Sequence, residues 1–166
     1  MRLKEKYHRE ISSLLSEYPD GHKRSAVMPL LFLAQQEYGY ISSEAMDEVA
    51  ALLDIDPTQV ASIVGFYTLY HSEEAGTHRI QICTDLPCAL RGAEQFSDQI
   101  CEHLGARIGE TTEDGMFTVE EVMCLAACDK APMFQLQTRD GISYHEKQTL
   151  EAVQEMTDRL RADGME

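Results

Sequence analysis

Two pairs of cysteines decide how this chain folds. The first pair lies in the stretch Ile82-Cys83-Thr84-Asp85-Leu86-Pro87-Cys88-Ala89-Leu90-Arg91-Gly92, with four residues between the thiols. The second pair lies in Met123-Cys124-Leu125-Ala126-Ala127-Cys128-Asp129-Lys130-Ala131-Pro132, with three residues between the thiols. Soft, anionic thiolates match ferric iron and bridging sulfide, and four of them complete two tetrahedral irons. The pattern therefore favours one [2Fe–2S] cluster, held by Cys83, Cys88, Cys124 and Cys128, and a folded domain must close the gap between the pairs.

Four cysteines can also serve other roles, of which a structural zinc site is the main alternative to an iron–sulfur cluster. Structural zinc also takes four cysteines, but its usual knuckle is a C-x-x-C hairpin, and neither pair has that spacing. Disulfides are typical of small secreted chains, whereas this sequence has an odd count of five Cys and we recognise no secretion signal. A thioredoxin-like redox pair would also need C-x-x-C. The fifth cysteine, Cys101, has a helical context, and we exclude it from the site because a free cysteine commonly behaves as a small buried hydrophobe.

The composition limits the partners of the chain. Its 29 acidic and 14 basic residues give a net charge of −15, which repels phosphate backbones and anionic lipid. We therefore expect no nucleic acid and a protein partner with a basic patch. The longest apolar run, residues 26–34, contains Pro29 and is far shorter than the roughly 20 residues of a membrane span, so we expect no membrane insertion. The sequence near the N-terminus lacks an apolar segment behind its basic residues, and a reducing cytosol is the expected compartment.

The first half of the chain reads as helical. Apolar residues at helical spacing predict helices over residues 3–18, 25–38 and 43–53. A fourth helix is expected to begin at Asp56 and Pro57, as N-cap and first helical residue, and to carry Phe66, Tyr67 and Tyr70. This helical part holds no chemistry that we can identify. Its aromatic end is interpreted as a partner surface or as a contact with the rest of the chain, with equal weight.

The pattern changes after a linker at residues 73–77. Alternating polar and apolar residues predict strands, and helical spacing predicts two further helices, in the order strand 78–83, helix 91–104, strand 116–123, strand 133–137, strand 142–144 and helix 149–161. Arg139-Asp140-Gly141 is expected to form a hairpin turn. The expected fold class is therefore α+β, with an N-terminal helical domain over residues 1–77 and an α/β domain with a small mixed sheet over residues 78–166.

The sequence resembles a known family, the thioredoxin-like [2Fe–2S] subunit of respiratory complex I, which is also called NADH-quinone oxidoreductase. The resemblance is carried by residues 65–70 (Gly-Phe-Tyr-Thr-Leu-Tyr), 80–94, 109–115, 117–122 and 124–132. It extends over nearly the whole chain, and it strongly favours the iron–sulfur interpretation over zinc. It implies a thioredoxin-like fold for residues 78–166 and a [2Fe–2S] cluster on the four cysteines named above.

The resemblance also implies a setting. Family members are one-electron carriers beside a flavoprotein subunit that binds FMN and NADH and a larger iron–sulfur subunit, on the cytoplasmic face of the inner membrane. Equivalent subunits occur in NAD-linked hydrogenases and formate dehydrogenases, and the sequence does not separate these settings. No G-x-G-x-x-G loop is present, so we assign neither FMN nor NADH to this chain and no catalytic residue of its own. A zinc-stabilised binding module and a stand-alone ferredoxin remain as alternatives from other classes.

Several residues near the cysteines carry further expectations. The family commonly has Cys-Leu-Gly-x-Cys in the second loop, where this chain has Ala126, so either a positive φ is attained without glycine or the loop shifts. Asp129 is interpreted as a cap of the ligand loop, and Pro132 is expected to be trans. Acidic neighbours predict a low reduction potential; Arg91 and Lys130 would raise it, but we expect both to be ordinary solvated residues.

Overall fold

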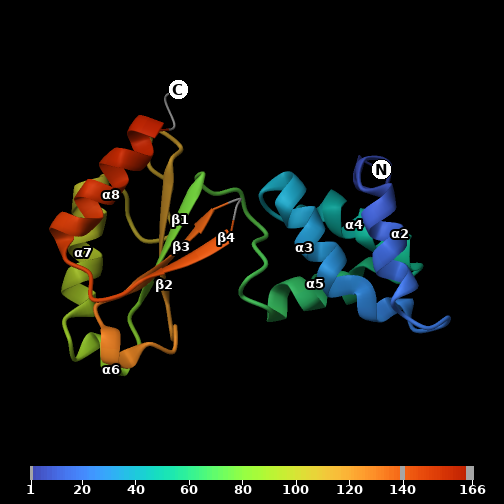
Figure 1. The fold of residues 1–166 in the computed structure, drawn as a ribbon, viewed down its shortest axis with the longest axis horizontal. Coiled ribbons are helices and arrows are strands. Elements are labelled where there is room, and N and C mark those ends of the chain that lie inside the picture. Colours follow the sequence, from blue (N-terminus) through green and yellow to red (C-terminus); the bar gives the residue numbers. More distant parts are fainter. Residues whose placement is uncertain (1, 139–140, 164–166) are drawn as a thin grey trace. The chain divides into compact units, whose positions relative to one another are not determined.

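Unit 1, the part of the chain before Ala75, is built from helices, and unit 2 begins at Ala75 (Figure 1). The structure is a computed structural model that describes residues 2–138 and 141–163. The helices of unit 1 are α1 (Arg2–Lys6), α2 (His8–Ser16), η1 (Lys23–Ala26), α3 (Val27–Tyr38), α4 (Ser43–Leu53) and α5 (Pro57–Phe66). Among the described residues, no helix has the length and apolar character needed to cross a bilayer.

The helix boundaries in unit 1 follow from local chemistry. The Ser42 side chain accepts a hydrogen bond from the Ala45 N–H at 3.2 Å and is the N-cap of α4. The carboxylate of Asp56 accepts from the Thr58 N–H at 2.8 Å, and Pro57 takes the first position of α5, where a missing N–H costs nothing. Gly39 ends α3 with a φ of +83°, a conformation open to glycine.

Two helix predictions in unit 1 need correction. The helix expected over residues 3–18 is split at Tyr7, whose hydroxyl donates to Glu37 at 2.8 Å. The fourth helix ends at Phe66 rather than continuing to Tyr70. The Gln35 side chain donates to the Leu69 carbonyl and accepts from the His71 N–H, both at 2.8 Å, so the segment after Phe66 is held against α3 as a turn.

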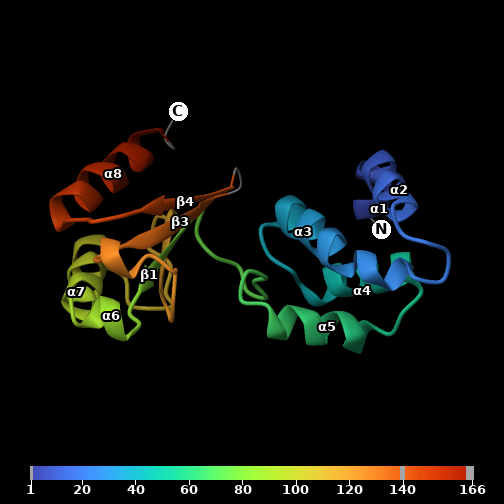
Figure 2. The same ribbon diagram turned by 60° about the horizontal axis from the view of Figure 1, so that its bottom comes forward.

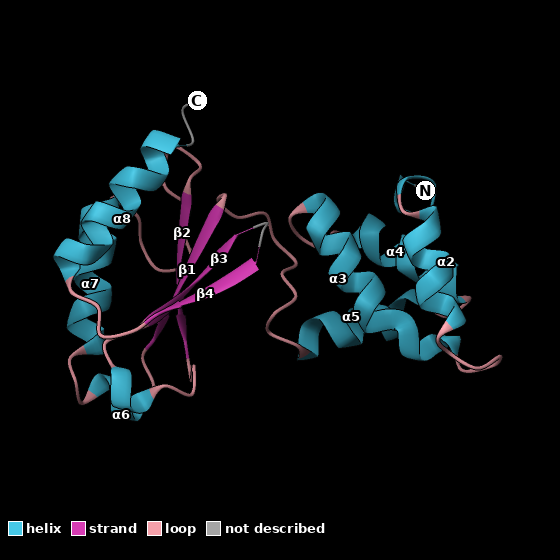
Figure 3. Ribbon diagram, in the orientation of Figure 1, coloured by secondary structure: helices cyan, strands magenta, loops and turns pink. Residues whose placement is uncertain are grey.

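Unit 2 is a mixed sheet with its helices, as Figure 3 shows by secondary structure. Its elements are β1 (His78–Cys83), α6 (Leu86–Ala89), α7 (Ala93–Leu104), β2 (Phe117–Val122), η2 (Cys128–Lys130), β3 (Phe134–Thr138), β4 (Gly141–His145) and α8 (Leu150–Asp163). The strand order is β2-β1-β3-β4; β1 runs parallel to β2 and antiparallel to β3, and β3 runs antiparallel to β4. The predicted α+β class with a small mixed sheet is confirmed. Two residues of the expected hairpin turn, 139 and 140, lie outside the described residues.

The core of unit 2 lies on one face of this sheet. Alternate strand residues such as Ile80, Val119 and Leu136 pack against the apolar faces of α7 and α8. The opposite face carries polar side chains that bond to one another, in the chain Gln135 to Gln81 to Glu120, with Arg79 also paired to Glu120. Arg79, Gln81 and Gln135 are buried and Glu120 is partly buried, and all four have partners, which is the condition under which burial of polar groups is tolerated.

The start of β1 is fixed by a close backbone approach. A Cβ on Gly76 would lie 2.8 Å from the carbonyl carbon of Met116, so only glycine fits there. The Gly76 N–H donates to the Thr118 hydroxyl at 2.7 Å, and the His78 N–H donates to the Met116 carbonyl at 2.8 Å. The first strand is therefore anchored beside β2 from its first residue.

Candidate iron–sulfur centre

The four cysteines follow the ends of the two parallel strands. Cys83 is the last residue of β1, and Cys88 lies in the short helix α6, whose start is capped by the Asp85 carboxylate accepting from the Leu86 N–H at 2.9 Å. Cys124 comes two residues after β2, and Cys128 begins η2. Because β1 and β2 are parallel neighbours, their carboxyl ends meet at one edge. Figures 1 and 2 show α6 beside the loop that contains η2 at this end of unit 2.

Contacts between the two ligand loops tie them together. The thiol of Cys83 lies 3.7 Å from the carbonyl oxygen of Met123, the residue before Cys124. The Thr84 N–H donates to the Val122 carbonyl at 3.1 Å. On the other side, the Arg91 guanidinium donates to the Asp129 carbonyl at 3.1 Å. The loops that carry the predicted ligands are therefore neighbours, although about forty positions separate them along the chain.

The pKa of the Cys88 thiol is affected by the other three thiols. Burial, a hydrogen bond to Cys83 and the nearby Cys83, Cys128 and Cys124 thiols together raise the pKa of Cys88 to about 12. Cys83 and Cys88 are buried among Ala93, Ala131 and Met133, whereas Cys124 and Cys128 are exposed. Without a metal, this environment disfavours the thiolate form of Cys88. Ferric iron supplies compensating positive charge and makes the thiolate favourable, because a thiol that coordinates a metal is deprotonated outright. The donor set therefore fits an iron–sulfur group.

Within residues 2–138 and 141–163, no group of three or more His, Cys, Asp or Glu side chains stands ready to hold a metal ion. Two observations are consistent with the predicted ligand set: the pKa of Cys88 is affected by the other three thiols, and the two ligand loops contact one another.

Ala126 resolves one open question from the sequence. Its φ is +58°, so the loop attains the left-handed conformation without glycine. Its N–H donates to the sulfur of Cys124 at 3.4 Å, a contact that stabilises negative charge on that sulfur. The Ala131–Pro132 bond is cis, so the expectation of a trans proline was wrong.

The charged neighbours have partners. Lys130 pairs with Glu146 at 2.7 Å, and this contact raises the pKa of the lysine. Arg91 is exposed, as expected of a solvated surface residue, and its guanidinium also donates to the Asp129 carbonyl, whereas Lys130 is only partly exposed. The Asp129 contact that the structure describes is through its backbone carbonyl rather than through a capping side chain. No pattern in the sequence signals the roles of the Met123 and Asp129 carbonyls, because backbone acceptors leave no trace in residue type.

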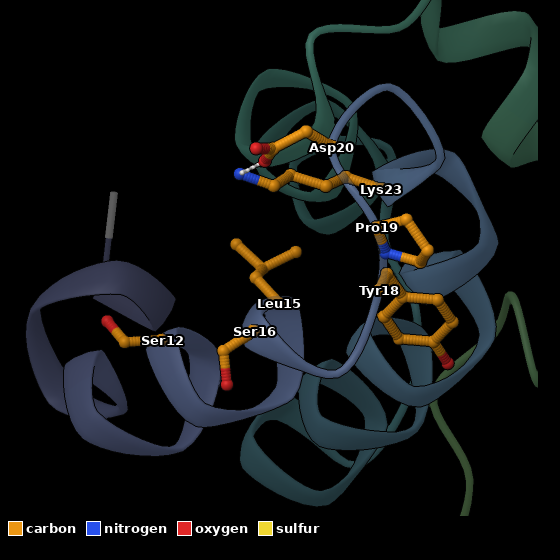
Figure 4. Close-up of a pocket in the computed structure, with 7 residues that line it drawn as sticks. All are labelled: Ser12, Leu15, Ser16, Tyr18, Pro19, Asp20 and Lys23. Atoms are coloured by element: carbon orange, nitrogen blue, oxygen red, sulfur yellow. Dashed lines mark ion pairs between the residues drawn. The ribbon is translucent and has the colours of Figure 1, made fainter.

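Two other features of the chain involve none of the four predicted ligands. Cys101 is in α7, packed against the core of unit 2, and burial raises its thiol pKa. In unit 1 a hollow of about 410 Å³ opens beside α2, where Lys23 faces Asp20 at 3.5 Å (Figure 4). It contains no cysteine, and the hydroxyls of Ser12 and Ser16 donate to backbone carbonyls of their own helix. We assign it no function.

Comparison with known proteins identifies the family. The chain is 40% identical over 136 residues to an NADH-quinone oxidoreductase subunit of Rhizobium meliloti, covering 82% of this chain and 77% of that protein. It is 37% identical over 143 residues to NADH-quinone oxidoreductase subunit 2 of Thermus thermophilus, covering 86% and 79%. A solved NAD⁺-reducing [NiFe]-hydrogenase shares the fold with a TM-score of 0.66 at 16% identity, over 80% of this chain and 22% of the hydrogenase chain. The family model for thioredoxin-like [2Fe-2S] ferredoxin matches residues 11–161, and the chain belongs to that family, whose cofactor is one [2Fe–2S] cluster.

Proposed function

We propose that this chain is the one-electron carrier of an NADH:quinone oxidoreductase, with one [2Fe–2S] cluster held by Cys83, Cys88, Cys124 and Cys128. The observation that carries the proposal is that the two loops with the thiol pairs follow the carboxyl ends of neighbouring parallel strands, β1 and β2, and contact one another. The relatives at 37–40% identity, both NADH-quinone oxidoreductase subunits by name, support the same setting.

The proposal extends to partners and position. The chain would work beside a flavoprotein subunit that binds FMN and NADH, and beside a larger iron–sulfur subunit, on the cytoplasmic face of the membrane that holds the complex. Unit 1 would serve assembly and unit 2 electron transfer, with domains at residues 1–77 and 78–166. The division of the chain at Glu74 and Ala75 lies close to this boundary.

When bound, the [2Fe–2S] cluster supplies reversible one-electron chemistry. With four thiolate ligands, its formal charge is −2 when oxidised and −3 when reduced. The chain stabilises or opposes the added charge through its own residues. The Ala126 N–H at the Cys124 sulfur favours it, as does the Arg91 cation against the second loop. The partial compensation of Lys130 by Glu146 weakens the contribution of that cation. The net charge of −15 opposes reduction, so the potential should be low.

Spectroscopy of the purified protein tests the cofactor. We expect a reddish-brown protein with two irons and two acid-labile sulfides per chain, and a rhombic EPR signal after reduction by dithionite. A colourless protein with stoichiometric zinc would instead support a binding module without redox function. Easy reduction by mild reductants would contradict the low potential while leaving the cluster intact.

The related hydrogenase setting is the second candidate. The solved hydrogenase is similar in fold, but at 16% identity that similarity does not favour its reaction over the quinone-linked one. Purification of the native protein together with its bound subunits decides between the two complexes. A [NiFe]-hydrogenase complex would contain nickel, and a quinone-linked complex would not.

A further inference from the structure

We propose that residues 146–148, the connection between β4 and α8, hold the end of the second ligand loop and determine how long Cys128 keeps the cluster bound. This connection is called the clasp below. It contains no predicted ligand, so its residues are positioning residues that act through the loop. The inference rests on the proposed function and adds to it a segment, distant from the cysteines in sequence, on which retention of the cofactor depends.

The two pairs of thiols are held in different ways. Cys83 and Cys88 are buried in an apolar cluster of unit 2, whereas Cys124 and Cys128 are exposed. Close packing therefore fixes the first pair, and it cannot fix the second pair in the same way. Exposed loops open more readily than packed segments, so the second loop is where a bound cluster is most easily released. The position of this loop depends on contacts that other segments make with it.

The clasp supplies three such contacts to the residues around the end of η2. The Lys147 N–H donates to the Lys130 carbonyl at 2.7 Å, and the Gln148 N–H donates to the Pro132 carbonyl at 2.9 Å. The ammonium group of Lys130 donates to the Glu146 carboxylate at 2.7 Å. Figures 1 and 2 show the connection between β4 and α8 beside the loop that contains η2. One short segment therefore binds the loop through two main-chain hydrogen bonds and an ion pair.

These contacts reach Cys128 through a single turn of backbone. The Lys130 N–H donates to the Ala127 carbonyl at 2.9 Å and closes the turn that contains Cys128. The next carbonyl after Cys128, that of Asp129, accepts from the Arg91 guanidinium of the first loop at 3.1 Å. The turn is therefore held between the first loop and the clasp, and release of the clasp would loosen the turn that carries the thiol.

The clasp itself has a fixed base at both ends. His145, the residue before it, pairs with Phe134 of β3 and stacks on its ring. Thr149, the residue after it, accepts from the Ala152 N–H at 3.3 Å at the start of α8. Between them Lys147 has a φ of +51°, a conformation that L-residues rarely adopt. Such a residue persists where the surrounding structure fixes its conformation, and here its N–H donates to the ligand loop.

The first test changes Lys147 and follows loss of the cluster. Cluster-loaded full-length chain is exposed to a fixed excess of an iron chelator, and visible absorption gives the rate of loss. Lys147→Pro removes the N–H and cannot take the positive φ, so it should speed the loss roughly tenfold or more. Lys147→Gly keeps the N–H and suits this φ, so it should lose the cluster like the original chain. Urea unfolding reports whether each variant is folded.

The ion pair gives a second, independent test that leaves the backbone unchanged. Lys130→Gln and Glu146→Gln should each speed the loss by up to about fivefold. Their midpoint potentials should move in opposite directions, because one substitution removes a cation and the other an anion. The double exchange Lys130→Glu with Glu146→Lys restores the pair and should restore retention. The matched control is Arg161→Gln, which breaks the pair with Asp114, similar in length and exposure, and should leave retention unchanged.

The outcomes separate the clasp from the proposed function. A folded Lys147→Pro that retains the cluster like the original chain would overturn the proposal; if this variant does not fold, the ion-pair variants decide. Retention that follows the potential, faster loss in one single variant and slower loss in the other, would assign the effect to charge and overturn it too. Equal acceleration by Arg161→Gln would do the same. If the original chain binds no iron–sulfur cluster, the proposed function fails and this inference fails with it.

Discussion

The backbone N–H of Ala126 points at the sulfur of Cys124, 3.4 Å away, and Ala126 itself has a φ of +58°. The two facts belong together, because the turn at Ala126 is what directs the loop past the first thiol of the second pair. An L-residue in this conformation costs roughly 1–2 kcal/mol, so the loop keeps a strained residue beside a predicted ligand.

Replacing Ala126 with glycine should relieve this strain. We expect Ala126→Gly to raise the free energy of unfolding by up to about 1 kcal/mol, because glycine adopts positive φ without strain. The gain is limited because glycine loses more backbone entropy on folding than alanine does. Urea unfolding followed by circular dichroism measures the change. The control is Ala127→Gly, whose φ of −125° suits alanine and which should destabilise the protein. Equal effects of the two substitutions would contradict strain at Ala126.

The assignment of ligands predicts a clear difference among the five cysteines. Serine in place of Cys83, Cys88, Cys124 or Cys128 should lose or distort the cluster, because an alkoxide is a harder and more basic ligand than a thiolate. Cys101→Ser should keep the visible and EPR spectra, since this residue is partly buried in α7 and packs against the core of unit 2. Loss of colour in Cys101→Ser, with colour kept in one of the other four, would mean that a wrong set was chosen.

The Arg91 contact with the Asp129 carbonyl joins the ligand loops, and its removal should loosen the second loop. Arg91 is exposed, so we expect Arg91→Met to reduce the stability of the closed loop by no more than about 1 kcal/mol. This corresponds to at most about fivefold faster bleaching of the cluster by an iron chelator. The loss of a cation should also lower the midpoint potential. Arg107→Met, in the loop after the far end of α7, is the control and should change neither quantity.

Much of this architecture could be predicted from the sequence, and the misses have physical causes. Helical and alternating periodicity located most helices and all four strands of the described chain. The short helix α6 was missed because a single turn that contains Pro87 and Cys88 shows no helical periodicity, and Gly92, with a φ of +86°, separates it from α7. The end of α5 depends on hydrogen bonds from Gln35, thirty-four positions away from Leu69, which no local pattern records.

The residue types of the candidate site could be predicted from the sequence, but the contacts between its loops could not. Spacing and soft-ligand chemistry pointed to the four cysteines. The order of strands, with β1 between β2 and β3, is not written in periodicity, yet it is what brings Cys83 beside Met123. The pairing of Lys130 with Glu146 likewise depends on β4 returning along β3.

Acid should weaken unit 2 through His145. Its ring stacks on Phe134 with centroids 4.7 Å apart, and burial lowers its pKa from the ordinary value of 6.5. Because the unfolded chain takes up the proton first, stability falls as the pH drops through 6.5 toward the lower folded pKa. Between about pH 7.5 and about pH 5.5, the wild type should lose more unfolding free energy than His145→Gln does. Parallel losses in the two proteins would assign the acid sensitivity to other groups, of which His78, also with a lowered pKa, is the first to replace.

The proposed division of labour predicts where a protease cuts. Glu73 and Glu74 are exposed and lie outside any helix or strand, whereas the chain is anchored to β2 from Gly76 onward. Exposed segments with few backbone hydrogen bonds open most readily, so a glutamate-specific protease should cut here first. The fragment that begins after Glu74 should keep the visible absorption, because all four predicted ligands lie in it. The double substitution Glu73→Gln and Glu74→Gln should resist this cut without changing the spectrum. First cleavage inside unit 2, or loss of colour as soon as the linker is cut, would mean that electron transfer and the helical part are not separable domains.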